Sequence, residues 1–216
     1  MKVGTDGMLL GAWTPIAGGD RVLDIGTGTG LVALMLAQRG SKLQIEAIEL
    51  DPEAASQAEE NVANSPFADR IRVRTGDLKS FQPNEPYDLI VSNPPFFAAG
   101  SPSPDPRKQQ ARHEASLPLS FLLAFAGDHL LEGGTLGLII PIDRLAGTIQ
   151  IGAIHQLWPQ QICRVMSTPQ KAPHRALVYF AKGKAGKPTE SVLVLQENGE
   201  FSQAYKDLTK DFHPFL

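Results

Sequence analysis

The fold of this chain is decided by the stretch Arg21-Val22-Leu23-Asp24-Ile25-Gly26-Thr27-Gly28-Thr29-Gly30. Residues 21–25 are mostly apolar and predict a short buried strand, whereas residues 31–38 predict a helix with one apolar face. The glycines between them let the backbone turn tightly and approach a ligand closely. A dinucleotide-binding fingerprint would need glycine at position 31, where this chain has leucine. We therefore expect a nucleotide-cofactor half-site without a pyrophosphate on the helix start.

Three carboxylates lie near the ends of predicted strands. Asp24 belongs to the first strand, Glu49 ends the strand over residues 44–50, and Asp77 follows the strand over residues 71–76. Ligands of parallel sheets bind beyond the carboxyl ends of the strands, and an acid about 20 residues after the glycines binds ribose hydroxyls. Glu49 has this placement, and Asp77 is placed to meet an adenine amino group. Each acid alone could be a solvated loop carboxylate, but the three together favour a binding site.

A further strand, predicted over residues 87–92, ends in Asn93-Pro94-Pro95-Phe96. The prolines fix φ and donate no hydrogen bond, so the Pro94 carbonyl is free to accept one. This carbonyl and the Asn93 side-chain oxygen can together accept both hydrogens of one planar amino group, and Phe96 offers a flat face for a stacked ring. We interpret the tetrapeptide as a socket for an exocyclic amine or a side-chain amide. The alternative is an Asn-Pro turn with a core phenylalanine.

The rest of the sequence alternates between the two element types. Helices are predicted over residues 53–64, 117–130 and 146–157, and strands over residues 134–141 and 176–182. Such alternation predicts an α/β fold, with a mostly parallel Rossmann-like sheet and helices on both faces. Residues 98–118 form a polar loop that is long for a compact domain, and we interpret it as a lid that RNA orders. Its basic residues are Arg107, Lys108 and Arg112.

Length and composition predict one cytoplasmic domain. A chain of 216 residues with 42% hydrophobic composition can bury one full core, so we expect a single domain over residues 1–216. Cys163, as the one cysteine, excludes an internal disulfide and is interpreted as a core residue. No apolar run approaches the roughly 20 residues of a membrane span, and no signal-peptide core follows Met1-Lys2. The histidines show no metal-binding spacing, and we expect a monomer without a metal.

The charge is segregated along the chain. Residues 144–189 contain seven basic and no acidic residues, so the remainder of a chain with net charge −3 carries −10. This asymmetry predicts a surface for a polyanion, with Lys171, Arg175 and Lys182 as RNA contacts. The alternative is a solvated basic face without a partner. The amine socket favours the RNA interpretation.

These residues resemble the S-adenosylmethionine-dependent methyltransferases of class I. Residues 24–30 are similar to their first motif, and residues 93–96 are similar to the catalytic motif of the branch that methylates exocyclic or amide nitrogen. The resemblance implies a seven-stranded sheet whose last strand is antiparallel, S-adenosylmethionine as cofactor and S-adenosylhomocysteine as product. The implied catalytic residues are Asn93, Pro94, Pro95 and Phe96. The implied cofactor-binding residues are Thr5, Asp24, Gly26, Gly28, Gly30, Glu49, Leu50, Asp77, Leu78 and Asn93.

A narrower resemblance covers nearly the whole chain. Residues 2–13, Lys-Val-Gly-Thr-Asp-Gly-Met-Leu-Leu-Gly-Ala-Trp, are similar to the opening segment of the bacterial tRNA(Val) adenine-N6 methyltransferases, which act on the adenine just 3′ of the anticodon. Residues 50–52, 54–55, 60–62 and 208–212 also resemble this family. In the family a stretch of chain precedes the opening segment and helps to wall the active site. Here the numbering starts just before that segment, so we make no prediction of how the target base is enclosed.

The sequence is compatible with three functions. The first is transfer of a methyl group to the N6 of an adenine in the tRNA anticodon loop. The second is methylation of a glutamine amide in a release factor, and the third is non-catalytic RNA binding on this fold. The opening segment and the basic block favour the first over the second. The intact tetrapeptide at residues 93–96 disfavours the third.

Overall fold

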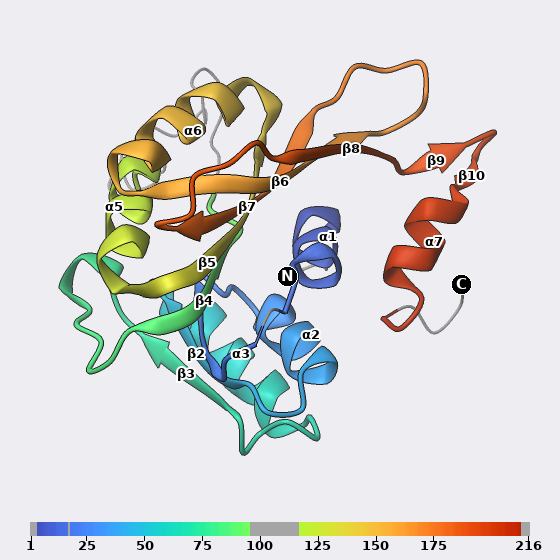
Figure 1. The fold of residues 1–216 in the computed structure, drawn as a ribbon. Coiled ribbons are helices and arrows are strands. Elements are labelled where there is room, and N and C mark those ends of the chain that lie inside the picture. Colours follow the sequence, from blue (N-terminus) through green and yellow to red (C-terminus); the bar gives the residue numbers. More distant parts are fainter. Residues whose placement is uncertain (1–3, 17, 96–116, 213–216) are drawn as a thin grey trace, which may run out of the picture.

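An eight-stranded sheet with the order β3-β2-β1-β4-β5-β7-β6-β8 forms the centre of the computed structural model, which describes residues 4–16, 18–95 and 117–212 (Figure 1). Strand β7 is antiparallel to its neighbours β5 and β6, and the other strands run parallel to one another. The strands are β1 Arg21–Ile25, β2 Gln44–Glu49, β3 Ile71–Thr75, β4 Tyr87–Ser92, β5 Leu130–Pro141, β6 Leu157–Met166, β7 Arg175–Lys182 and β8 Thr189–Val194.

The predicted fold class is confirmed, with one strand more than expected. The seventh strand, β7, is antiparallel as the family resemblance implies. Strand β8 then adds an eighth at the β6 edge, parallel to β6, so the last strand of this sheet is not the antiparallel one. Its first four residues are exposed, because it is the outermost strand on that side. An edge strand of this kind has little of the hydrophobic alternation that reveals a strand in a sequence.

Helices cover both faces of the sheet (Figure 1). They are α1 Thr5–Trp13, α2 Leu31–Arg39, α3 Pro52–Ala63, α5 Leu119–His129, α6 Leu145–Ile154 and α7 Gln203–Thr209, with the short 3₁₀ helices η1 Leu78–Ser80 and η2 Ile142–Arg144 and the small hairpin of β9 Gln196–Glu197 and β10 Glu200–Phe201. Among the described residues, no helix is long and apolar enough to cross a membrane.

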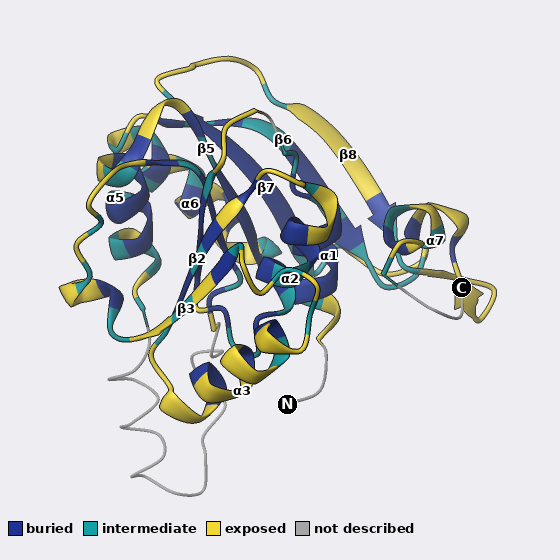
Figure 2. Ribbon diagram, turned by 90° about the horizontal axis from the view of Figure 1, so that it is seen from below, coloured by how far each residue is buried: buried dark blue, intermediate teal, exposed yellow. Residues whose placement is uncertain are grey.

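The core consists of two apolar layers, one on each side of the sheet. Strand β7 shows why, since Leu177 and Tyr179 pack into one layer while Val178 and Phe180 pack into the other. Side chains alternate between the two faces along a strand, so a strand buried on both sides is apolar throughout. Figure 2 shows the sheet interior buried and the outer surface of α3 exposed. Cys163 lies in the first layer, as the sequence predicted.

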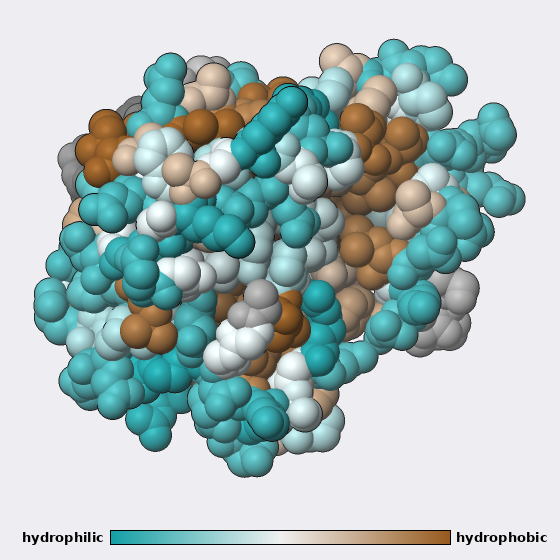
Figure 3. Space-filling model, in the orientation of Figure 1, coloured by the Kyte–Doolittle hydropathy of each residue, from teal (hydrophilic) through white to brown (hydrophobic). Residues whose placement is uncertain are grey.

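The C-terminal segment packs onto the same core. Leu193 of β8 and Tyr205 of α7 are buried in the layer that also contains residues of α1 and α2. Ser202 begins α7 by accepting a hydrogen bond from the Tyr205 backbone N–H at 3.1 Å. Apolar surface remains around β8 and α7 (Figure 3), and Val192 of β8 is an exposed hydrophobic residue. These contacts join α7 to the sheet.

Candidate active site

A pocket of about 370 Å³ lies at the carboxyl ends of β1, β2 and β4. Its volume falls within the roughly 300–1,000 Å³ range of small-molecule sites. Its position agrees with the rule that ligands bind at this edge of a parallel sheet. The pocket is lined by Gly4, Gly7, Asp24, Ile25, Gly26, Thr27, Gly28, Thr29, Leu31, Val32, Ile48, Glu49, Leu50, Gly76, Asp77, Leu78, Lys79, Ser92, Asn93, Pro94, Pro95 and Leu117.

The glycine loop between β1 and α2 forms one wall of this pocket. Gly26 has φ +70 and Gly28 has φ +58, and a Cβ atom at either position would meet no atom within 4 Å. Their backbones therefore face open space, where a ligand can approach closely. Gly30 differs, because it does not line the pocket and a Cβ there would lie 3.5 Å from the Ala58 Cβ of α3. Gly30 therefore lies beside α3, and its φ of +83 is what favours glycine at this position.

Helix α3 supports the glycine loop from behind. It begins at Pro52, and the Asp51 side chain caps it by accepting a hydrogen bond from the Glu53 backbone N–H at 3.0 Å. From its third turn, the Asn61 Nδ2 donates to the Thr29 carbonyl at 2.9 Å. This bond fixes the loop to the helix, and the sequence contains no local signal for it.

Glu49, at the end of β2, has a carboxylate that accepts two backbone hydrogen bonds. The Gly28 N–H donates to Oε2 at 2.8 Å, and the Asp51 N–H donates to Oε1 at 3.0 Å. A carboxylate has about four lone-pair sites, so roughly two remain for further donors. The two hydroxyls of a ribose fit this remaining capacity. Glu49 and the open backbone of the glycine loop therefore suit a nucleoside cofactor.

Asp24 is buried within β1 and is not a loop carboxylate. It is 1% exposed, and the Thr27 Oγ1 donates to its Oδ2 at 2.6 Å. Burial disfavours the ionised form and raises the pKa of Asp24 to about 7, against the opposing effect of the Thr27 hydrogen bond. Asp24 is among the residues that line the pocket, so this predicted cofactor-binding residue lies where expected.

Another wall of the pocket is formed by the turn after β3. Asp77 caps η1, because its Oδ1 accepts a hydrogen bond from the Lys79 backbone N–H at 2.9 Å. Leu78 is 5% exposed and Leu50 is 43% exposed, and both line the pocket. The three predicted residues Leu50, Asp77 and Leu78 therefore share one cavity with Glu49 and the glycine loop.

The tetrapeptide predicted to hold an amine begins directly at the end of β4. Asn93, Pro94 and Pro95 line the pocket, whereas Phe96 lies outside the described residues. Helix α1, which the sequence did not predict, packs against this point through Gly7, where a Cβ would lie 3.9 Å from the Asn93 Nδ2. Thr5 is exposed and does not line the pocket.

The three predicted RNA-binding residues that the structure describes, Lys171, Arg175 and Lys182, do not lie together on one surface. Lys171, in the turn between β6 and β7, is exposed at the same edge of the sheet as the pocket. Lys182 ends β7 at the opposite edge, where its Nζ donates to the Leu130 carbonyl at 2.9 Å. Arg175 forms an ion pair with Asp6. Arg107, Lys108 and Arg112 lie outside the described residues.

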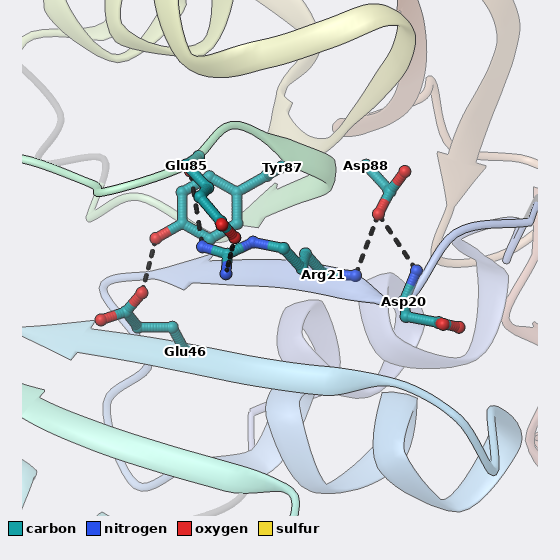
Figure 4. Close-up of polar contacts among 6 residues, drawn as sticks. All are labelled: Asp20, Arg21, Glu46, Glu85, Tyr87 and Asp88. Carbon is teal, nitrogen blue, oxygen red and sulfur yellow. Dashed lines mark hydrogen bonds and ion pairs between the residues drawn. The ribbon is translucent and has the colours of Figure 1, made fainter.

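A larger hollow of about 850 Å³ runs along β3, and none of the predicted site residues that the structure describes lines it. Several of the polar groups in and beside this hollow are paired with one another. Figure 4 shows Arg21 paired with Glu85 at 2.9 Å and the Tyr87 hydroxyl donating to Glu46 at 2.6 Å. The backbone N–H groups of Asp20 and Arg21 both donate to the Asp88 carboxylate, each at 3.0 Å (Figure 4). These contacts join the start of β1 to β4 and to the turn before it, and they join β4 to β2, so we assign them a structural role.

The chain resembles solved methyltransferase structures over most of its length. A predicted O-methyltransferase from Agrobacterium tumefaciens superimposes with a TM-score of 0.77 and 22% identity, over 95% of this chain and 96% of that one. The glycopeptide N-methyltransferase MtfA, in complex with S-adenosyl-L-methionine, superimposes with a TM-score of 0.59 and 13% identity, over 82% and 94% of the two chains. The fold is therefore that of the class I methyltransferases.

Sequence comparison narrows the class to a family. Residues 7–141 match the Methyltransferase small domain. The tRNA1(Val) (adenine(37)-N6)-methyltransferase of Klebsiella pneumoniae is 42% identical over 221 residues, covering 100% of this chain and 89% of the relative. The protein of the same name from Bacteroides thetaiotaomicron is 42% identical over 217 residues, covering 100% and 92%. The chain belongs to the tRNA1(Val) (adenine(37)-N6)-methyltransferase family.

Proposed function

We propose that this protein transfers the methyl group of S-adenosylmethionine to the exocyclic N6 of adenine 37, the base 3′ of the anticodon in tRNA1(Val). The observation that carries the proposal is the placement of Asn93 and Pro94 in the same pocket as Glu49 and the glycine loop. Strand β1 separates β2 from β4, so the nucleoside-binding end and the amine-binding end lie side by side at one edge of the sheet. The names of the relatives support this substrate.

In this proposal, different residues of the pocket bind different parts of the cofactor. Glu49 accepts hydrogen bonds from the ribose hydroxyls, and Asp77 accepts one from the adenine amino group. Leu50 and Leu78 form the apolar walls beside them. S-adenosylmethionine supplies an electrophilic methyl group on its sulfonium. Gly26 and Gly28 lack side chains at the wall, and this leaves room for a ligand close to the backbone.

Asn93 and Pro94 hold the nitrogen that receives the methyl group. The Asn93 side-chain oxygen and the Pro94 carbonyl each accept one hydrogen of the adenine amine, which aims the nitrogen at the methyl carbon. An adenine amine is a poor nucleophile because its lone pair is delocalised, so positioning supplies much of the rate. No strong base is required before transfer, since the methylated cationic amine loses its proton afterwards. Phe96 stacks on the target base in this proposal. The base must first be unstacked from its neighbours in the RNA, and this costs least in a loop.

The basic residues on the pocket side of the sheet form the RNA-binding surface in this proposal. Arg144 follows β5 in η2, and Lys171 precedes β7, so both lie at the carboxyl edge of the parallel strands. Lys182, Lys184 and Lys187 lie at or beyond the far end of β7. A tRNA with its anticodon loop in the pocket would contact the first group of residues. The basic residues of the 98–118 loop, Arg107, Lys108 and Arg112, remain proposed contacts.

Methyl transfer to defined RNAs tests the function. Unmodified tRNA1(Val) should gain N6-methyladenine at position 37, whereas the same transcript with guanine at position 37 should gain none. A release factor carrying its glutamine should also remain unmethylated, and nucleoside and peptide mass spectrometry identify the product. Methylation of the release factor without methylation of the tRNA would support the glutamine-amide alternative. We further propose that the chain acts as one domain and as a monomer in the cytoplasm.

A further inference from the structure

An ion pair joins the first turn of α1 to the first residue of β7. The Arg175 Nε lies 2.9 Å from the Asp6 Oδ2, and the two side chains are each 32% exposed. The residues are 169 positions apart in the sequence, so the contact exists only in the folded chain. Partial burial shields the pair from solvent more than an exposed surface pair. Arg175 therefore already has an anionic partner within the protein.

The Arg175 guanidinium is anchored to the sheet as well as to α1. Its Nη1 donates to the His174 carbonyl at 3.2 Å, and the backbone N–H of Ile142 donates to the same carbonyl at 3.2 Å. Arg175 also pairs in register with Pro141 of β5 and with Val165 of β6. The arginine thus sits at the carboxyl ends of β5 and β6. It provides a fixed point to which the Asp6 carboxylate attaches.

The segment held by this pair forms part of the reaction pocket. Gly4 and Gly7, on either side of Asp6, both line it. A Cβ at Gly7 would lie 3.2 Å from the Leu31 Cδ2 and 3.9 Å from the Asn93 Nδ2, so the start of α1 lies directly against the amine-binding asparagine. A displacement of this turn would therefore change the wall beside Asn93.

We propose that Asp6 and Arg175 are positioning residues, whose ion pair holds the first turn of α1 against Asn93 and so shapes the wall of the target-base socket. This proposal rests on the proposed function, because it assigns Asn93 to the reacting amine. It also replaces the phosphate contact predicted for Arg175 with a contact inside the protein. The far end of α1 is held independently, since the Arg39 Nη1 donates to the Gly11 and Thr14 carbonyls at 2.7 and 2.8 Å.

The test compares two ion pairs of the same sheet. Asp6→Asn, Arg175→Gln and their double variant remove the pair beside the pocket. Arg164→Gln with Glu190→Gln removes a control pair that joins β6 to β8. We expect each first-pair variant to lower the single-turnover rate at saturating tRNA by about tenfold to a hundredfold, since misplacement of about 1 Å can cost this much. The control variant should retain the parental rate.

Coupling and salt dependence separate the proposal from its alternative. If the pair acts as a unit, the double variant should be no slower than either single variant, because both remove the same interaction. Exchanging the charges, with Asp6→Arg and Arg175→Asp, should restore at least part of the rate. All variants should keep the parental logarithmic salt slope of tRNA binding. A slope lowered by roughly 0.7–0.9 in Arg175→Gln alone, with Asp6→Asn unaffected, would overturn the proposal in favour of a phosphate contact.

Hydrogen exchange in α1 gives a readout that does not require activity. The first helical hydrogen bond, from the Met8 N–H to the Gly4 carbonyl at 3.2 Å, should lose protection in Asp6→Asn and in Arg175→Gln. The same hydrogen bond should keep its protection in the control variant, Arg164→Gln with Glu190→Gln. If the parent protein does not methylate tRNA, the proposed function fails. Loss of protection in Asp6→Asn and Arg175→Gln would then still show that the ion pair fixes the first turn of α1. Unchanged protection in these variants would overturn the proposal.

Discussion

The backbone N–H of Gly28 donates a hydrogen bond of 2.8 Å to the Glu49 carboxylate, so the ends of β1 and β2 are joined across the cofactor pocket. One acidic side chain therefore has two tasks in our proposal. It holds the glycine loop in place with one oxygen and still has lone pairs for ribose hydroxyls. A residue with both tasks should affect cofactor binding more than a lost ribose contact alone.

Replacing Glu49 with alanine should weaken S-adenosylmethionine binding about tenfold or more, since hydrogen bonds to a charged group contribute roughly 1.5–3 kcal/mol. Isothermal titration calorimetry measures the affinity, and circular dichroism checks the fold. Glu53→Ala, on the exposed first turn of α3, is the control and should bind as the parent does. Parental affinity in a folded Glu49→Ala protein would reject the ribose contact.

Gly30→Ala should destabilise the fold through the backbone. Gly30 has φ +83, a conformation that costs an L-residue about 1–2 kcal/mol, and the new methyl group would sit against Ala58. We expect the free energy of unfolding in urea to fall by that amount. Gly147→Ala is the contrasting variant, because Gly147 is an exposed residue within α6 without a positive φ. There alanine should raise stability by about 0.5–1 kcal/mol. Equal effects at the two positions would show that the positive φ of Gly30 carries no cost for alanine.

The stability of the protein should depend on pH through Asp24. Its pKa is about 7 in the folded chain and 3.8 in the unfolded reference. Because the folded state holds this proton more tightly, the contribution of Asp24 is fully present below pH 4 and is lost as the pH rises through 7. The Asp24→Asn variant has no ionisable group at this position. Its free energy of unfolding, relative to that of the parent, should therefore increase by up to a few kcal/mol between pH 4 and pH 8. Urea unfolding at a series of pH values measures this. Parallel stability curves would show that Asp24 does not carry the effect.

Much of the pocket could be predicted because its residues follow strands with strong local patterns. The predicted strand at residues 21–25 matches β1, and Gly26, Gly28, Glu49 and Asp77 all line the pocket. Strand β6 was missed, because Pro159 and neighbouring glutamines interrupt its apolar pattern and its register with β7 shifts between Pro159 and Gln161. The helix predicted over residues 146–157 therefore includes Leu157, which instead begins β6.

Contacts between distant segments explain the remaining differences. Helix α1 contains Gly7 and Gly11, which disfavour a helix in isolation. A Cβ at Gly11 would lie 2.7 Å from the Met35 Sδ, so the glycine permits close packing of α1 on α2. This reason exists only in the folded protein. Gly30, which is predicted to bind the cofactor, does not line the pocket and lies beside Ala58 of α3. Its contact with the cofactor stays a prediction.

The salt dependence of tRNA binding should distinguish the two edges of the sheet. Arg144→Ala with Lys171→Ala removes two charges at the pocket edge, and each lost phosphate contact should lower the logarithmic salt slope by roughly 0.7–0.9. Lys184→Ala with Lys187→Ala removes the same charge beyond the far end of β7 and should leave the slope unchanged. Filter binding at several salt concentrations measures both. A larger change of the salt slope in Lys184→Ala with Lys187→Ala would place the RNA on the edge of the sheet opposite the pocket.

Asn93→Ala should separate chemistry from cofactor binding. Asn93 follows β4, whereas Glu49 ends β2 with β1 between them, so the amide can be removed without touching the ribose contact. The variant loses one of the two acceptors that aim the amine at the methyl carbon. By analogy with loss of one preorganised polar contact at a reacting centre, kcat should fall by about 10²–10³.

The control for this variant is Asn84→Ala, an exposed asparagine in the turn before β4 that lies outside the pocket. Calorimetry should give all three proteins nearly the same affinity for S-adenosylmethionine. Single-turnover methylation at saturating tRNA should then be severely reduced in Asn93→Ala alone. A parental rate in that variant would mean that the nitrogen is positioned without the amide, and Asn93-Pro94 would be a turn that ends β4. A loss of rate together with a loss of cofactor affinity would instead place Asn93 in the cofactor site.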